Sequence, residues 1–177
     1  MVTETTTPSA TASKVAHGFF AALSMNDLDA AMGYFSDETV YDVVPLGEIC
    51  GKPAICRFYA ELRAAFADYE MTVERVITSH STAVVQWRAG GTFSGGQFQG
   101  VAPTGKHVDI RGVDVMDVAE GRIRHNTTYY DGATFARQIG LLPRSGSGVE
   151  EAMLTVFNAA TRLHQRLSEH THGHEEA

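Results

Sequence analysis

The sequence predicts an α+β domain in which a strongly curved antiparallel sheet wraps as a cone around three N-terminal helices, with an extra C-terminal helix. Apolar residues recur at helical spacing up to residue 67, and from Tyr69 onward they alternate with polar residues, as in strands. With 177 residues, 44% of them hydrophobic, the chain can bury one core. We therefore expect one domain over residues 13–143.

Three helices are expected before the sheet. Ser13 offers an N-cap to the first and Asn26 to the second, within NDLDAAMGYF, after which DETVYDVV has the composition of a strand. The third is expected over residues 53–67, with a proline near its start. Its apolar residues follow i, i+3, i+4 spacing and are Ile55, Phe58, Tyr59, Leu62 and Phe66.

Five later segments have the alternating pattern of strands, namely MTVERVIT, TAVVQWRAGGTF, QFQGVA, KHVDIRGVDVMDV and RIRHNTTYYD. Each is bounded by Gly, Ser, Pro or a charged turn. Gly90, Gly91 and Gly112 lie inside strand patterns and are candidate positions for β-bulges that curve the sheet. A sheet curved in this way forms a cone with one open mouth.

The two ends of the chain differ from the domain. Residues 1–12 are expected to be disordered, and after a short helix ending at Gly140, residues 144–148 have the composition of a linker. Residues 149–168 predict an amphipathic helix whose apolar face needs a cover, either the domain's own sheet or a partner subunit. That face carries Met153, Val156, Phe157, Ala160, Leu163 and Leu167. We expect a homodimer, formed through the sheet or this helix.

Charge and composition exclude several classes of partner. The chain has 14 basic and 21 acidic residues, a net charge of −7 and no basic stripe, so we expect neither nucleic acid nor an anionic membrane surface as partner. No secretory signal or spanning segment is visible, which predicts a soluble cytoplasmic protein with Cys50 and Cys56 reduced. The tail, residues 169–177, is expected to be disordered, with its alternating histidines solvated rather than bound to metal.

Residues 105–131, GKHVDIRGVDVMDVAEGRIRHNTTYYD, place polar groups among apolar ones. Alternation puts Asp114 on the same face as Val108, Ile110, Met116 and Val118. In the next strand, the face that carries Ile123 also carries His125, Thr127, Tyr129 and Asp131. The sequence therefore predicts an acid and a histidine in one interior.

An apolar interior keeps a carboxyl group protonated near neutral pH, so that it can donate to a developing enolate oxygen. Asp114 fits that role, and Asp131, His125 and Asp42 are candidates for the base that removes a proton next to a carbonyl. Each also has a structural interpretation. Asp42 could end a turn, Asp114 could pair with structural donors, Asp131 could cap a helix and His125 could be a satisfied sheet residue.

The order of elements in residues 13–143 resembles the nuclear transport factor 2-like superfamily. Within it, residues 98–143 are most similar to the SnoaL-like polyketide cyclases, through a PTGK turn, a GRI turn, a terminal Asp and QIGLLP. The resemblance implies ring closure of an aromatic polyketide by intramolecular aldol addition, with no cofactor and no metal. It also implies Asp131 as the acid/base, with His125, or with less support His107, polarising the substrate.

Two other branches of the superfamily give alternatives. Similarity to ketosteroid isomerases places Asp42 at the proton-shuttling aspartate and Asp114 near the second acid, but Phe19 stands where that family has a tyrosine donor. Similarity to limonene epoxide hydrolases would use Arg111 between Asp114 and Asp131, and would need a bulge at Gly112. The fold also includes non-catalytic proteins that bind small ligands.

We therefore expect a small apolar carbonyl compound as the substrate. The catalytic groups of the protein are predicted to be Asp131 and His125, assisted by Asp114 or Asp42. The pocket lining is predicted to be Phe19, Tyr59, Trp87, Phe98, Met116, Tyr129 and His107.

Overall fold

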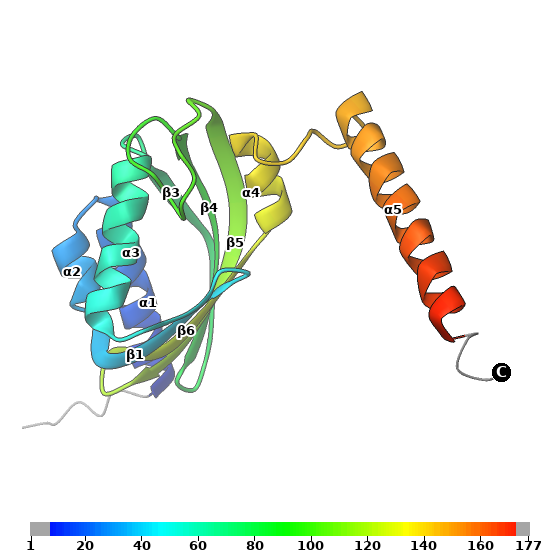
Figure 1. The fold of residues 1–177 in the computed structure, drawn as a ribbon. Helices are drawn as coiled ribbons and strands as arrows, with labels where there is room; N and C mark the ends of the chain where they lie inside the picture. Colours follow the sequence, from blue (N-terminus) through cyan, green and yellow to red (C-terminus); the bar gives the residue numbers. More distant parts are fainter. Residues whose placement is uncertain (1–7, 173–177) are drawn as a thin grey trace, which may run out of the picture.

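The computed structural model describes residues 8–172 (Figure 1). Three helices come first along the chain with a short hairpin between the second and third, four long strands follow, and two helices end the chain. The elements are α1 (Pro8–Ser24), α2 (Leu28–Met32), β1 (Phe35–Val44), β2 (Gly47–Cys50), α3 (Lys52–Ala65), β3 (Glu70–Ser79), β4 (Thr82–Thr92), β5 (His107–Ala119), β6 (Arg122–Tyr130), α4 (Gly132–Ile139) and α5 (Gly148–His172). This order confirms the predicted α+β class, including the extra C-terminal helix.

The six strands form one sheet in the order β2-β1-β6-β5-β4-β3. Four neighbouring pairs are antiparallel, whereas β1 and β6 run parallel. The sheet curves around α1 and α3, which cover its concave side (Figure 1). Residues from both helices and from the inward positions of the strands make one core, which the curved sheet encloses. Within the described residues, no helix is long and apolar enough to cross a membrane.

The helices begin close to the predicted positions, with two differences. Helix α1 begins at Pro8, five residues before the expected cap at Ser13, and α2 is capped by Asp27, whose side chain accepts a hydrogen bond from the Ala30 amide, rather than by Asn26. Helix α3 has Pro53 in its first turn, where a missing amide proton costs nothing. Residues 1–7 of the expected disordered segment lie outside the described residues.

The sheet is bent at positions other than the predicted glycines. Pairing between β4 and β5 runs unbroken from Thr82 to Thr92, so neither strand bulges at Gly90, Gly91 or Gly112. The register shifts instead at Glu74 in β3, at Arg124 in β6 and between Phe35 and Val40 in β1. The segment QFQGVA was also wrong as a strand, because it makes only an isolated bridge between Phe98 and Val101.

Helix α5 stands away from the sheet and from the other helices (Figure 1). It begins at Gly148, next to the predicted linker, and continues to His172, so that the first four residues of the predicted tail are helical. All side chains of residues 151–162 are exposed. The rest of the tail, with His174, lies outside the described residues.

Candidate functional site

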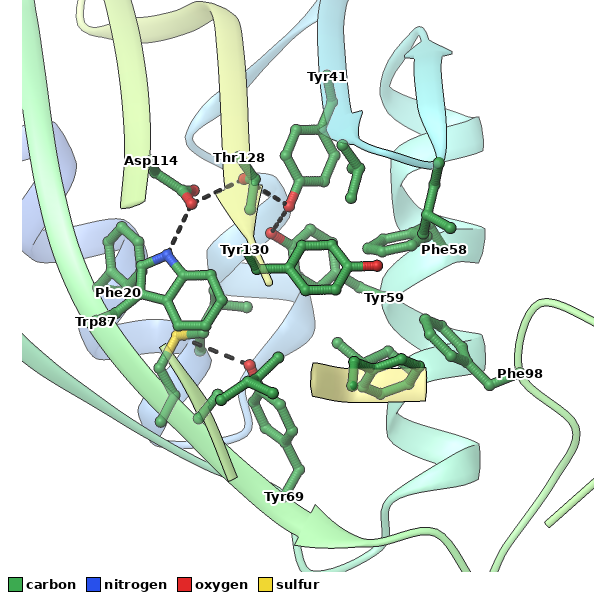
Figure 2. Close-up of a pocket in the computed structure, with 18 residues that line it drawn as sticks. Phe20, Tyr41, Phe58, Tyr59, Tyr69, Trp87, Phe98, Asp114, Thr128 and Tyr130 are labelled. Atoms are coloured by element: carbon green, nitrogen blue, oxygen red, sulfur yellow. Dashed lines mark hydrogen bonds between the residues drawn. The ribbon is translucent and has the colours of Figure 1, made fainter. Parts of the chain in front are cut away.

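Asp114 is a buried carboxylate at the inner face of β5. Only 2% of its surface is exposed, and Ile110, Met116 and Val118 share its side of the strand, as alternation predicted. Three donors surround it, and two of them, Trp87 and Thr128, are drawn in Figure 2. The Trp87 indole donates to Oδ1 at 2.8 Å, the Thr128 hydroxyl to Oδ1 at 2.7 Å and the Asn126 amide to Oδ2 at 2.8 Å. The carboxylate is thus held in one orientation by neighbours on three sides.

Burial raises the pKa of the Asp114 carboxyl above its ordinary value, and the hydrogen bonds from Asn126, Trp87 and Thr128 oppose that shift without cancelling it. Since the pKa is higher in the folded state, the bound proton stabilises the fold. This contribution is complete below the ordinary pKa and is lost as the pH rises through the folded-state pKa. Asp114 is therefore a stronger base than an exposed aspartate and can retain a proton closer to neutral pH.

Gly112 gives Trp87 its place beside the carboxylate. The two residues are directly opposite in the β4–β5 pairing, and a Cβ at position 112 would lie 2.2 Å from an indole ring carbon of Trp87. The ring therefore lies over the bare glycine backbone, from where its N–H reaches Asp114. The glycine that we expected to mark a bulge instead makes room for a donor.

Hydroxyl groups continue from Asp114 into the cavity. The Thr128 hydroxyl lies 3.1 Å from that of Tyr41, and the Tyr59 hydroxyl donates to Tyr41 at 3.2 Å (Figure 2). Thr128 has one proton, so when it donates to Asp114 it can accept from Tyr41. Burial raises the pKa of both tyrosines well above the ordinary value, with the charge of Asp114 adding to the effect. Both phenols keep their protons and can donate.

The cavity around these groups has a volume of about 90 Å³ and an almost wholly apolar wall. Asp114, Thr128 and the hydroxyls of Tyr41 and Tyr59 are at one end of it (Figure 2). The remaining wall is built by α1, α3, α4 and the strands. It consists mainly of Phe20, Leu23, Val43, Leu46, Phe58, Leu62, Tyr69, Met71, Trp87, Ala89, Phe98, Ile110, Tyr130 and Phe135. Pockets for drug-sized ligands usually measure about 300–1,000 Å³, so a ligand of several rings must displace part of this wall.

A bulge in β6 reverses the predicted orientation of its second half. Ile123 pairs with Val118 and His125 with Asp117, which leaves Arg124 as an extra residue. From there on Asn126 and Thr128 are buried, whereas Tyr129 is 52% exposed and His125 hydrogen-bonds to its neighbour Thr127 on the same outward side. The prediction that the face of His125 and Tyr129 enters the interior was therefore wrong.

Asp131 follows β6 and caps α4. Its exposed carboxylate accepts hydrogen bonds from the Thr134 amide at 2.9 Å and from the Thr134 hydroxyl at 2.6 Å. These bonds lower the pKa of the carboxyl below its ordinary value. The structural interpretation, helix capping, is thus what the geometry shows, and Asp131 is not among the residues that line the cavity.

Of the other predicted site residues, some line the cavity, some are buried in the core and some lie on the surface. Tyr59, Trp87 and Phe98 line the cavity, whereas Phe19 and Met116 are buried in the core without lining it. Asp42 points away, because its neighbours Tyr41 and Val43 take the inward positions of β1.

On the outer face of β5, His107 and Arg111 are exposed. With no bulge at Gly112, Arg111 keeps the opposite orientation to Asp114, so the arrangement expected for epoxide hydrolysis is not formed.

Four polar residues of the site escaped prediction, namely Tyr41, Tyr69, Asn126 and Thr128. Tyr41 and Val43 alternate in VYDVV, a signal that could have placed Tyr41 inward and Asp42 outward. No comparable signal exists for Asn126 and Thr128, because the bulge precedes them. Among the residues that the structure describes, no group of three or more His, Cys, Asp or Glu side chains is placed to hold a metal ion.

Comparisons with known proteins agree on the fold. The sequence model of the SnoaL-like polyketide cyclase family matches residues 14–139. No curated protein matches the chain. Among solved structures, AclR of Streptomyces galilaeus, a proposed hydroxylase, is 20% identical with a TM-score of 0.68, over 88% of this chain and 98% of the other.

Two further structures are described as polyketide cyclases. A proposed SnoaL-like cyclase from Jannaschia sp. CCS1 is 21% identical, with a TM-score of 0.69 over 80% of this chain and all of the other. IdmH from Streptomyces antibioticus, also a proposed cyclase, is 22% identical, with a TM-score of 0.62 over 73% of this chain and 98% of the other. Identities at this level show a shared fold.

Proposed function

The chain belongs to the SnoaL-like polyketide cyclase family, and we propose that it catalyses acid/base ring closure of an apolar carbonyl compound by intramolecular aldol addition, with Asp114 as the group that takes and returns the proton. The observation that carries the proposal is the connection of a buried carboxylate of raised pKa, through Thr128, to two phenolic donors in one apolar cavity. In the proposed reaction, the part of these protein groups is to accept and donate protons.

The first step is removal of a proton from the carbon next to a substrate carbonyl. The Asp114 carboxylate takes this proton, and the electrons of the C–H bond form an enolate. A base whose pKa lies closer to the working pH is more effective, and positioned proton transfer contributes about 10²–10⁴-fold. Once Asp114 is protonated it can donate to Thr128 and Thr128 to Tyr41, so that Tyr41, which keeps its proton and accepts from Tyr59, can donate to the negative oxygen and stabilise it.

The second step forms the ring. The enolate carbon attacks another carbonyl carbon of the same molecule, its own carbonyl re-forms, and the electrons of the attacked C=O bond move to oxygen. That oxygen takes a proton from Tyr41. Thr128 then passes the proton of Asp114 to Tyr41, so that the carboxylate is restored and no proton is gained or lost overall.

This proposal shifts the catalytic role from Asp131 and His125 to Asp114. Asp131 caps α4 and does not line the cavity, and His125 lies on the outward side of β6. Asp114 is the predicted site residue that both lines the cavity and carries an acidic group.

The satisfied hydrogen bonds of Asp114 also favour a second candidate function, binding of an apolar ligand without catalysis. A buried carboxylate with three donors can be a purely structural element. The two functions differ in one observable, because only the enzyme increases proton exchange next to a carbonyl.

The test measures deuterium exchange at the α-carbon of acetophenone and 2-tetralone in D₂O by proton NMR. The full-length protein should accelerate the loss of the α-proton signal, and Asp114→Asn should reduce the acceleration by about 10²-fold or more. Asp117→Asn is the matched control, since Asp117 lies on the same strand but is exposed and accepts from Thr82. This control should exchange like the wild type.

Ligand binding is followed separately through Trp87, the one tryptophan of the chain, which lines the cavity. A ligand that changes its fluorescence without faster exchange in the wild type overturns the catalytic proposal and favours the binding protein. Exchange that survives Asp114→Asn overturns the role of Asp114.

A further inference from the structure

Helix α5 exposes large apolar side chains that its own domain does not cover. Val149 and Val156 are 70% exposed, Phe157 is 65% exposed and Met153 is 48% exposed. Soluble monomers rarely leave such side chains together on one element, and a contiguous patch of this kind marks an interaction surface.

The spacing of these residues is that of a coiled-coil seam. Val149, Met153, Val156 and Ala160 follow one another at intervals of four, three and four residues, and the same alternation continues in the sequence at Leu163 and Leu167. A strict 4-3 repeat lies along one narrow stripe and is suited to pairing with another helix.

The start of α5 directs the helix away from its own cavity. The Glu150 carboxylate accepts hydrogen bonds from the Gly146 amide at 2.6 Å and from Arg137 of α4 at 3.3 Å. These contacts tie the first turn of α5 to α4, and from there the helix extends away from the domain (Figure 1). A helix held in this direction meets a second molecule more readily than its own sheet.

The distribution of charged residues along α5 favours an antiparallel over a parallel helix pair. The first turn carries Glu150 and Glu151, and basic residues follow near the other end, with Arg162 exposed and Arg166 next in the sequence. Two parallel copies would align like charges, whereas two antiparallel copies place the acidic turn of one beside the basic end of the other. Antiparallel packing also opposes the helix dipoles.

We propose that α5 is a dimerisation helix that pairs antiparallel with α5 of a second copy of this chain, through the 4-3 repeat that runs in the sequence from Val149 to Leu167 and has its midpoint at residue 158. The chemistry of the stripe is self-complementary, as a two-fold symmetric contact requires. The small Ala160 allows close approach near the middle of the pair.

The oligomeric state is tested by analytical ultracentrifugation of the full chain. The wild type should sediment as a dimer, and Val156→Glu should raise the dissociation constant at least tenfold. Asn158→Glu is the matched control, because it adds the same charge to the same helix away from the stripe, and it should leave the dimer unchanged. Circular dichroism and Trp87 fluorescence check that both variants fold. A monomeric wild type, or equal behaviour of the two variants, overturns the proposal.

The direction of the pair is tested with spin labels on Glu151→Cys and Asn158→Cys, each in a Cys50→Ser, Cys56→Ser background. The two positions are seven residues apart and therefore face the same way. In an antiparallel pair centred near residue 158, the label-to-label axial offset is small at 158 and roughly 20 Å at 151, from a rise of about 1.5 Å per residue. Equal distances at both positions overturn the antiparallel arrangement.

Discussion

One aspartate, Asp114, lines the cavity and another, Asp131, lies at the start of α4, and the pKa values of their carboxyl groups are shifted in opposite directions. Asp114 is buried, and its pKa is raised although three groups donate to it. Asp131 is exposed, and its pKa is lowered by two hydrogen bonds from Thr134. Both accept hydrogen bonds, so the difference comes from the loss of water around Asp114. Desolvation, rather than the number of donors, therefore separates the carboxyl group with a raised pKa from the one with a lowered pKa.

Replacing each aspartate by asparagine sharpens this comparison most. Asp114→Asn keeps the side-chain volume and removes the proton-accepting oxygen, so the turnover of an accepted carbonyl substrate should fall by about 10²–10⁴-fold with little change in ligand binding. Asp131→Asn should leave turnover within about twofold, because asparagine caps helices as well as aspartate does. Steady-state kinetics of the pair, with dissociation constants from Trp87 fluorescence, provide the measurement. A larger loss in Asp131→Asn would restore Asp131 as the catalytic acid/base.

Thr128→Val breaks the connection between Asp114 and the phenols without changing the shape of the side chain. Since the hydrogen bond from Thr128 lowers the pKa of Asp114, its removal should raise that pKa further. Turnover should fall by about 10-fold or more, in line with the loss of a hydrogen bond to a charged group.

The pKa of Asp114 is measured by pH titration of Trp87 fluorescence, since the indole donates directly to the carboxylate. The wild-type transition should lie above the ordinary aspartate value, Thr128→Val should move it upward, and Asp114→Asn should abolish it. A transition that remains in Asp114→Asn belongs to another group and contradicts the assignment.

Gly112→Ala tests the space that holds the indole. The added methyl group would lie within the van der Waals radius of the Trp87 ring, so the ring must move or the strands must separate. Overpacking of this kind typically costs about 1–3 kcal/mol in the free energy of unfolding. Denaturant unfolding measures the loss, and a red shift of Trp87 emission reports exposure of the ring. Gly148→Ala, at a glycine with no atom within 4 Å of the added Cβ and no positive φ, controls for the substitution.

Asp131→Ala should have the smallest effect, a modest loss of stability confined to α4. Because the pKa of Asp131 is lowered in the fold, its stabilising contribution is present above the ordinary pKa and is lost as the pH falls through the folded-state pKa. Wild type and variant should therefore differ in melting temperature near neutral pH and converge in acid. A difference that persists in acid would show that the hydrogen bond to Thr134 does not depend on the charge.

The sequence was sufficient to predict the fold class and the inward position of Asp114, because both depend on regular periodicity. Three helical stretches and a long series of alternating segments specify a curved sheet around helices, and β5 keeps its alternation from Val108 to Val118. Trp87 and Phe98 were also identified as lining residues, through their size and apolar character alone.

The prediction from alternation failed in β6, where one extra residue reverses which side chains face inward. Alternation in β6 is correct up to Ile123 and wrong from His125 onward, since a β-bulge has no reliable signature in a single sequence. The resemblance to other families led to Asp42, although its neighbour Tyr41 is the residue that reaches the cavity. Similarity indicates which residue types a family uses in its site, whereas the direction in which each side chain points depends on the local backbone geometry.

The extra residue in β6 also bears on how this family can vary in length. Arg124 and His125 both face outward, so a chain that lost Arg124 would resume plain alternation with Asn126 and Thr128 still directed inward. Deletion of Arg124 is therefore expected to leave the residues that face the cavity unchanged. A deletion two residues later would turn the inward side chains of the rest of β6 outward, and the outward ones inward. A chain without Arg124 would keep Asn126 and Thr128 beside Asp114, so sequences with a gap at this position are best compared by the direction in which their side chains face.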